Sequence, residues 1–146
     1  MALIKDFLTG DHRHCDELLT VAESAVDAGD WPDAEQKTRA FLMAMENHLR
    51  MEEEVMFPAF EQASGMTQGP TMVMRREHDQ MRTLFAQIED ALQRHDEDDF
   101  LGSTETLLIL IQQHNMKEEG MLYPMADEQL GGRAEQVLGE MKAAAG

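Results

Sequence analysis

Two stretches of the sequence decide the fold, His48–Pro58 (HLRMEEEVMFP) and His114–Pro124 (HNMKEEGMLYP). Each begins with a histidine, carries a glutamate four residues later and ends with an aromatic residue followed by proline. Four residues is slightly more than one turn of an α-helix, so the histidine and the glutamate lie on the same helix face. The second stretch repeats this pattern position by position, which indicates an internal repeat.

The offset that places His48 on His114 also aligns other parts of the chain, because Asp11-His12 falls on Glu77-His78. The same offset also aligns four apolar stripes, in which residues recur at three- and four-residue spacing. In the first and third segments, Leu8, His12, Cys15, Leu19, Ala22 and Val26 match Met74, His78, Met81, Phe85, Ile88 and Leu92. In the second and fourth, Phe41, Met45, His48, Glu52, Val55 and Ala59 match Leu107, Ile111, His114, Glu118, Met121 and Met125. This spacing is typical of helices facing the interior of a bundle, so the sequence predicts two copies of one helical hairpin.

Clusters of helix-breaking residues divide the chain into four long helical segments. Gly29 suits the position after a helix, Asp30 can cap the next helix, and Pro70 suits a first helical turn. The predicted helices cover about residues 3–28, 33–62, 71–94 and 98–127, and about 133–145 form a short fifth helix. The predicted fold class is all-α: an up-down-up-down antiparallel four-helix bundle with a short C-terminal fifth helix. We expect one domain over residues 1–146, with the bundle at about 3–128 and a C-terminal tail or helix at 129–146.

The composition narrows the class of protein. The 146 residues include 12 Lys and Arg against 29 Asp and Glu, a net charge of −17, which disfavours nucleic acids and anionic membranes as partners. No apolar run approaches the roughly 18 residues of a membrane-spanning helix, and the first residues lack the pattern of a signal peptide. The single cysteine, Cys15, cannot form an internal disulfide, which fits a reducing compartment. We therefore expect a soluble cytoplasmic protein.

Glu52 and Glu118 are the unusual members of the apolar stripes. A buried carboxylate without a positive partner costs several kcal/mol or becomes protonated. None of the four stripes contains a lysine or an arginine that could act as that partner. The partner is therefore expected to be a metal cation.

The histidines of the four stripes are expected to share one height in the bundle. In an antiparallel hairpin, two residues lie at the same height when the mean of their numbers falls in the connecting loop. The pairs His12/His48 and His78/His114 have means of 30 and 96, and both numbers fall in predicted loops. Four imidazoles and two carboxylates in one layer form a ligand set for two transition-metal ions, and iron or manganese is favoured over structural zinc.

These motifs resemble the hemerythrin-like (HHE cation-binding) family, and the resemblance covers roughly residues 5–128. It implies a four-helix bundle around a non-haem di-iron centre, in which an oxo or hydroxo bridge joins the two iron ions. It also implies chemistry with dioxygen, nitric oxide or peroxide. Histidines are the implied terminal ligands and glutamates the implied bridges: His12, His48, Glu52, His78, His114 and Glu118.

The sequence departs from the oxygen-carrying hemerythrins in two places. The resemblance places a fifth histidine of those proteins one turn before His78, where this chain has Met74. It also places an aspartate five residues after His114, where this chain instead has Glu118 at four residues. One fewer imidazole leaves a coordination position for water or a small ligand. This favours sensing, iron handling or peroxide chemistry over reversible oxygen transport.

Three functions remain open from the sequence. The first is a di-iron protein that binds or reacts with dioxygen, nitric oxide or peroxide in the bundle core, in a sensing, scavenging or stress role. The second is an iron-handling enzyme: a ferroxidase, a peroxidase or a protein that repairs iron centres. The third is a structural bundle that binds zinc or no metal. We expect a metal- and oxygen-binding protein rather than a dedicated enzyme, either monomer or homodimer.

Several residues near the motifs are expected to have structural roles. His14 lies on a different helix face from His12 and is expected in solvent. Cys15 is expected to pack inside the bundle. Tyr123 corresponds to Phe57 in the repeat, which favours a packing role over a chemical one.

The sequence also predicts the roles of residues next to Glu52 and Glu118. Glu53, Glu54 and Glu119 fall outside the apolar stripes and are expected to need no compensating positive partner. Pro58 and Pro124 are expected to bend their helices just beyond Glu52 and Glu118.

Overall fold

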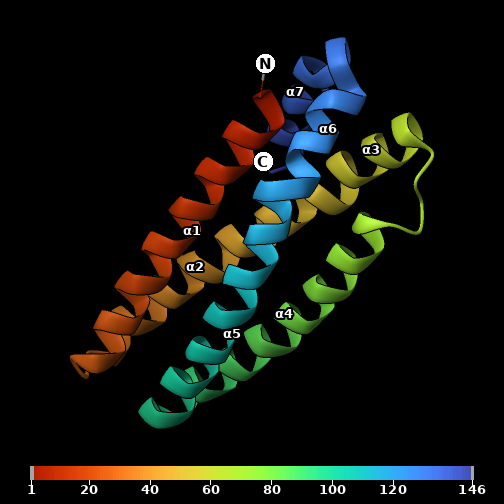
Figure 1. Ribbon diagram of the computed structural model, residues 1–146. Coiled ribbons are helices and arrows are strands. Elements are labelled where there is room, and N and C mark those ends of the chain that lie inside the picture. The colour runs from red at the N-terminus through yellow and green to blue at the C-terminus, as the bar shows by residue number, and fades with distance from the viewer. Residues whose placement is uncertain (1, 146) are drawn as a thin grey trace.

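The computed structural model describes residues 2–145, which form a bundle of long helices (Figure 1). Helices α1 (Leu3–Asp27) and α4 (Pro70–Gln93) are continuous. The second long helix consists of α2 (Trp31–Met51), η1 (Glu52–Met56) and α3 (Phe57–Ser64). The fourth consists of α5 (Glu97–Lys117), η2 (Glu118–Leu122) and α6 (Tyr123–Leu130). A short turn, η3 (Gly131–Arg133), leads to α7 (Ala134–Ala144). The predicted all-α, up-down-up-down bundle with a short C-terminal helix is confirmed, and its helix boundaries differ from the prediction by a few residues.

The loops between the helices follow from local residue chemistry. Gly29 adopts a φ of +74°, a left-handed conformation that glycine accepts without strain after a helix. The side chain of Asp30 then accepts a hydrogen bond from the backbone N–H of Asp33 at the start of α2. Asp96 caps α5 in the same way by accepting from the backbone N–H of Asp99. Short capped loops of this kind make consecutive helices antiparallel, as Figure 1 shows.

Two apolar clusters fill the interior and leave a polar layer between them. The cluster toward the α1–α2 and α4–α5 loops includes Phe41, Phe85 and Phe100. The other lies toward the chain termini and includes Leu8 and Phe60. His12, on α1 between these two clusters, belongs to the polar layer and is also buried. The centre of the bundle is therefore dry on both sides of this layer.

The second and fourth long helices each contain a π-helical segment that begins at a stripe glutamate. The backbone N–H of Phe57 donates to the carbonyl of Glu52, and that of Tyr123 donates to the carbonyl of Glu118. Both bonds span five residues and widen the helix locally. A proline follows each aromatic residue and cannot donate a backbone hydrogen bond, so the wide turn accommodates it.

The π-helical segments correct the predicted stripes beyond the glutamates. Val55 and Met121 were expected inside the bundle, but Val55 is only partly buried and Met121 is 59 % exposed. The buried positions are instead Met56 and Leu122, each four residues after its glutamate. One extra residue in the wide turn rotates the following helix, which is why a regular helical period fails here.

Helix α7 closes the end of the bundle that holds the chain termini (Figure 1). Its buried side chains, including Val137 and Met141, join the apolar cluster at that end. Nearby, the carboxylate of Asp127 accepts hydrogen bonds from the backbone N–H groups of Ile4 and Lys5. These contacts tie α6 to the first turn of α1.

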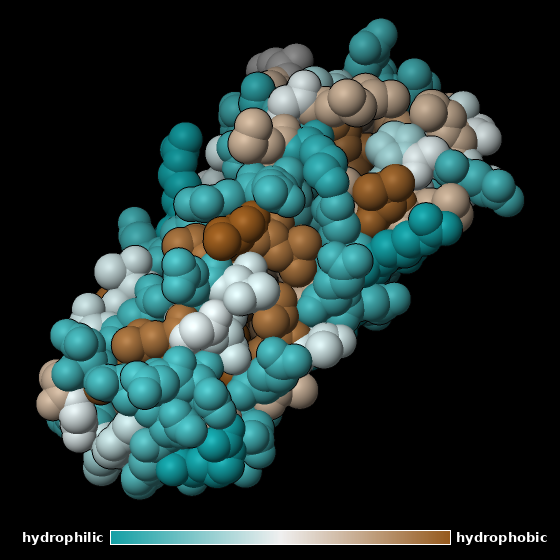
Figure 2. Space-filling model, turned by 60° about the horizontal axis from the view of Figure 1, so that its bottom comes forward, coloured by the Kyte–Doolittle hydropathy of each residue, from teal (hydrophilic) through white to brown (hydrophobic). Residues whose placement is uncertain are grey.

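The face of the molecule in Figure 2 is largely hydrophilic, with hydrophobic patches along its middle. Over residues 2–145, no helix has the length and hydrophobicity needed to span a bilayer.

Candidate metal centre

Six side chains meet in the polar layer of the bundle. They form two groups that each combine two imidazoles with the same two carboxylates. The first group is His12, His48, Glu52 and Glu118. The second group is Glu52, His78, His114 and Glu118. Within each group, one potential ligand atom from every residue lies within 4.8 Å of the others, and all six residues are buried. We call these groups the first and the second metal position.

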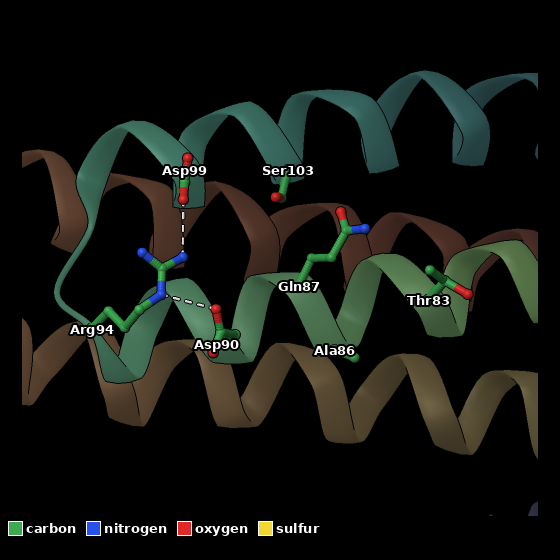
Figure 3. Close-up of a pocket in the computed structure, with 7 residues that line it drawn as sticks. All are labelled: Thr83, Ala86, Gln87, Asp90, Arg94, Asp99 and Ser103. Carbon is green, nitrogen blue, oxygen red and sulfur yellow. Dashed lines mark hydrogen bonds and ion pairs between the residues drawn. The ribbon is translucent and has the colours of Figure 1, made fainter.

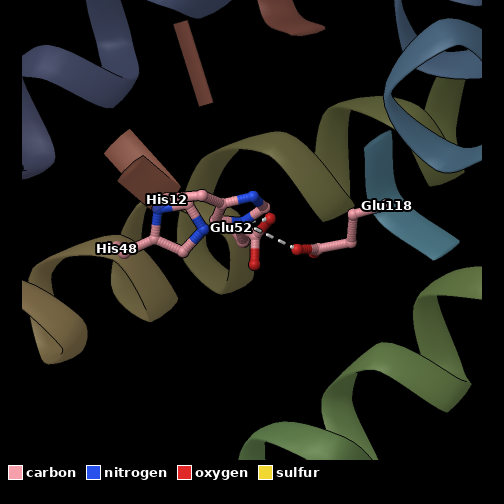
Figure 4. Close-up of side chains that lie close together, drawn as sticks. All are labelled: His12, His48, Glu52 and Glu118. Atoms are coloured by element: carbon pink, nitrogen blue, oxygen red, sulfur yellow. Dashed lines mark ion pairs between the residues drawn. The ribbon is translucent and has the colours of Figure 1, made fainter. Parts of the chain in front are cut away.

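Each of the two glutamates lies between the two histidine pairs. Glu52 approaches Nε2 of His48 at 3.5 Å and Nε2 of His78 at 3.0 Å. Glu118 approaches Nε2 of His12 at 3.2 Å and Nε2 of His114 at 3.1 Å. Figure 4 shows the Glu118 carboxylate reaching from η2 across the bundle toward the residues of the first position. This sharing is the arrangement that bridging carboxylates require.

The other nitrogen of every imidazole is bound to a carboxylate at the rim of the layer. The four Nδ1 atoms donate across distances of 2.7–2.8 Å. The donor and acceptor pairs are His12 and Glu119, His48 and Asp11, His78 and Glu53, and His114 and Glu77. Such carboxylates set the ring orientation of metal-binding histidines and direct the Nε2 lone pair at the metal. Glu53 and Glu119, for which the sequence predicted no role at the site, therefore each orient one imidazole.

The inner atoms of the layer fit metal ions on chemical grounds. When Nδ1 donates, Nε2 of a neutral imidazole is an acceptor, and here it faces carboxylate oxygens that are also acceptors. Within residues 2–145, buried atoms without a hydrogen-bond partner include Oε1 of Glu52, Oε2 of Glu118 and Nε2 of His78 and His114. No lysine or arginine is buried in that part of the chain. Cations between the carboxylates and imidazoles would satisfy these atoms.

The pKa values show where protons go when no metal ion is bound. Burial lowers the pKa of His48, but the carboxylates of Glu52 and Asp11 outweigh burial and raise it to about 10. Burial likewise lowers the pKa of His78, while Glu52 and Glu53 raise it to about 9. Burial favours neutral Glu52, yet His48 and the surrounding hydrogen bonds hold its pKa well below the usual range. The layer therefore attracts positive charge, as protons or as metal ions.

Tyr123 also lies in the polar layer. The repeat had favoured a packing role for this residue, and its contacts with the buried polar residues were not predicted. Its hydroxyl is fully buried, donates to Glu52, and lies 2.9 Å from Oε1 of Glu118 and 3.1 Å from Nε2 of His12. Burial and the two carboxylates raise the pKa of Tyr123 well above its usual range. Its counterpart Phe57 stacks on the ring of His78 at 5.5 Å between centroids. The sequence signal that could have indicated this polar role is the replacement of phenylalanine in the first repeat by tyrosine in the second.

A small cavity lies against the histidines. Its volume is about 10 Å³, and its lining includes His12, His48 and His114 together with Cys15 and Met81. This volume is close to that of one water-sized probe, so the cavity suits a ligand of very few atoms. Burial, with Asp11 and Asp16, raises the pKa of the Cys15 thiol to about 12, which keeps it a neutral packing group. His14 is exposed, as predicted.

A larger open groove of about 650 Å³ lies between α4 and α5, away from the metal centre (Figure 3). Its one cationic side chain is Arg94, which is bound by Asp90, Asp96 and Asp99. These three carboxylates already satisfy the guanidinium, so the groove offers no free charge to an anionic ligand.

A buried layer of four histidines and two glutamates inside a four-helix bundle defines the class of metal-binding helical bundles. The family model of the hemerythrin HHE cation-binding domain matches residues 3–126, so the chain belongs to this family. No curated protein and no solved structure shows a significant match to the chain.

Proposed function

We propose that this protein holds two iron ions and that the centre binds or reacts with dioxygen, nitric oxide or peroxide, in a sensing, scavenging or stress role. The terminal ligands would be the four buried histidines and the bridges would be Glu52 and Glu118. One observation carries the proposal: both glutamates lie between the two histidine pairs, so two cations can share them. Imidazole and carboxylate ligands without a thiolate favour iron or manganese over a structural zinc ion.

Bound iron would supply the electron-transfer chemistry that these small ligands require. The chain contributes orientation, because the carboxylate on each Nδ1 holds its imidazole with Nε2 facing inward. It also contributes a dry environment, because apolar clusters lie on both sides of the layer. The cavity of about 10 Å³ beside three of the imidazoles limits access to ligands of a few atoms.

Metal analysis of the purified protein tests this proposal. After aerobic iron loading we expect about two iron ions per chain and a charge-transfer absorption in the near ultraviolet. His48→Ala removes a ligand, and Glu118→Ala removes a carboxylate that both positions share, so both variants should lose iron. His14→Ala is the matched control, because His14 is exposed on α1 and this variant should bind as much iron as the unmodified protein.

Mixing the reduced, iron-loaded protein with each small ligand tests the second half of the proposal. We expect one spectral change that saturates at about one ligand per iron pair. Sustained turnover of peroxide or ferrous iron would instead identify an enzyme. A protein that stays colourless and cannot be loaded with iron would contradict the proposal.

A further inference from the structure

The internal repeat makes the two metal positions alike, so each difference between them is informative. The repeat places His12 and His48 on His78 and His114. It also places Phe57 on Tyr123. Both aromatic residues are buried and both follow a π-helical segment. The hydroxyl group of Tyr123 therefore has no counterpart in the other half of the chain.

This hydroxyl lies among the potential ligand atoms of the first position. It donates to Glu52 and lies 2.9 Å from Oε1 of Glu118. It also lies 3.1 Å from Nε2 of His12 and 3.5 Å from Nε2 of His48. All four residues of the first position are thus within hydrogen-bonding distance of one phenolic oxygen. Neither histidine of the second position has a hydrogen bond to it.

The two positions also differ in the charges around the carboxylates that bind their histidines. At the second position, Arg82 binds Glu53 at 2.9 and 3.0 Å, and Lys117 binds Glu77. The carboxylates behind both second-position histidines therefore carry a cationic partner. In the other half of the repeat, Asp16 stands in the place of Arg82, and an apolar Met51 stands in the place of Lys117.

The first position has no such compensation. Within residues 2–145, neither Asp11 nor Glu119 has a lysine or arginine within ion-pair distance. Asp16 lies near Glu119 and adds further negative charge behind His12. An uncompensated carboxylate makes the imidazole that donates to it a stronger electron donor. The first position is therefore better suited to the more highly charged ion of a pair.

We infer that the oxygen of Tyr123 is an additional ligand of the metal ion in the first position, so that the two positions are inequivalent. This inference rests on the proposed function. The phenol loses its proton to solvent when it binds, and the metal–oxygen bond takes the place of the O–H bond. The first ion then has one more anionic oxygen than the second. The second has no matching oxygen, because Phe57 carries no hydroxyl group.

Spectroscopy of the iron-loaded protein tests this inference. A tyrosinate bound to ferric iron gives a charge-transfer band in the visible region and resonance-enhanced ring vibrations. The chain contains a single tyrosine, so any such signal must come from Tyr123. We expect the band in the unmodified protein, and we expect ring-deuterated tyrosine to shift the vibrations. This measurement needs no variant that could fail to fold.

Two substitutions extend the test. Tyr123→Phe removes the hydroxyl group and keeps the ring, so it should abolish the visible band while about two iron ions remain bound. Adding Phe57→Tyr to that variant moves the phenol to the matching place at the second position and should restore a band. If the unmodified protein binds iron but shows no tyrosinate signal, the inference is wrong and the proposed function stands. If the protein binds no iron, both fail.

Discussion

In the absence of bound metal ions, the stability of this protein should fall as the pH rises, and the raised pKa values of two histidines give the size of the effect. Without metal, the pKa of His48 is raised to about 10 and that of His78 to about 9, from an ordinary value of 6.5. Both values are raised, so the stabilisation is complete below pH 6.5 and is lost as the pH rises through about 9 to 10.

Between these limits the folded state holds two protons that the unfolded state has released. Each proton difference is worth about 1.4 kcal/mol per pH unit. The free energy of unfolding should therefore fall by about 2–3 kcal/mol between about pH 7.5 and about pH 8.5. His114 shifts in the same direction and adds to the slope.

Urea denaturation followed by circular dichroism, with a chelator present, measures this slope. The iron-loaded protein is the matched control, because it has the same surface acids and its imidazoles are neutral ligands at every pH in the range. Its stability should change much less. A metal-free protein whose stability stays constant or increases over this interval would refute the reasoning, because the buried carboxylates would then not attract protons to the imidazoles.

Three further predictions concern the support of the site and the fold. Asp11→Asn weakens the acceptor that orients His48 and should lower the affinity for metal about 10- to 100-fold, measured by competition with a chelator. Asp96→Ala removes the cap that accepts from the backbone N–H of Asp99 and should cost about 1 kcal/mol of stability in urea denaturation. Phe60→Ala empties a fully buried place in the cluster near the termini and should cost about 3–5 kcal/mol, measured in the same way with the metal removed. Unchanged affinity or stability in any of these variants would contradict the role assigned to that residue.

The sequence predicts the fold well because each long helix keeps a regular apolar period up to its polar layer. The means of paired residue numbers placed His12 beside His48, and the structure brings these two imidazoles within 4.5 Å between ring centroids. The loops were predictable too, because Gly29 and Asp30 have specific backbone and capping preferences.

The helix segments beyond the two glutamates are not predictable from the sequence, because a regular period cannot describe a π-helical turn. Pro58 and Pro124 lie just beyond these turns, and the widening of the helix before each proline was not predicted. The widening rotates the next residues along the helix, so the phase of a regular helix does not bring Tyr123 to the polar layer.

The outer carboxylates were missed for a different reason. Glu53 lies outside its own apolar stripe, yet it reaches His78 on a neighbouring helix. Periodicity along one helix describes which face is buried, but it does not describe contacts across a helix boundary. Only the three-dimensional arrangement shows that each imidazole has a carboxylate behind it.

The most direct test of the account is an anomalous-scattering map from crystals of the iron-loaded protein, recorded at the iron absorption edge. The account predicts two iron peaks inside the bundle, one beside His12 and His48 and the other beside His78 and His114, with Glu52 between them. No peak in the layer, or a single peak bound by residues of only one position, would contradict the claim that the two glutamates bridge a pair of metal ions.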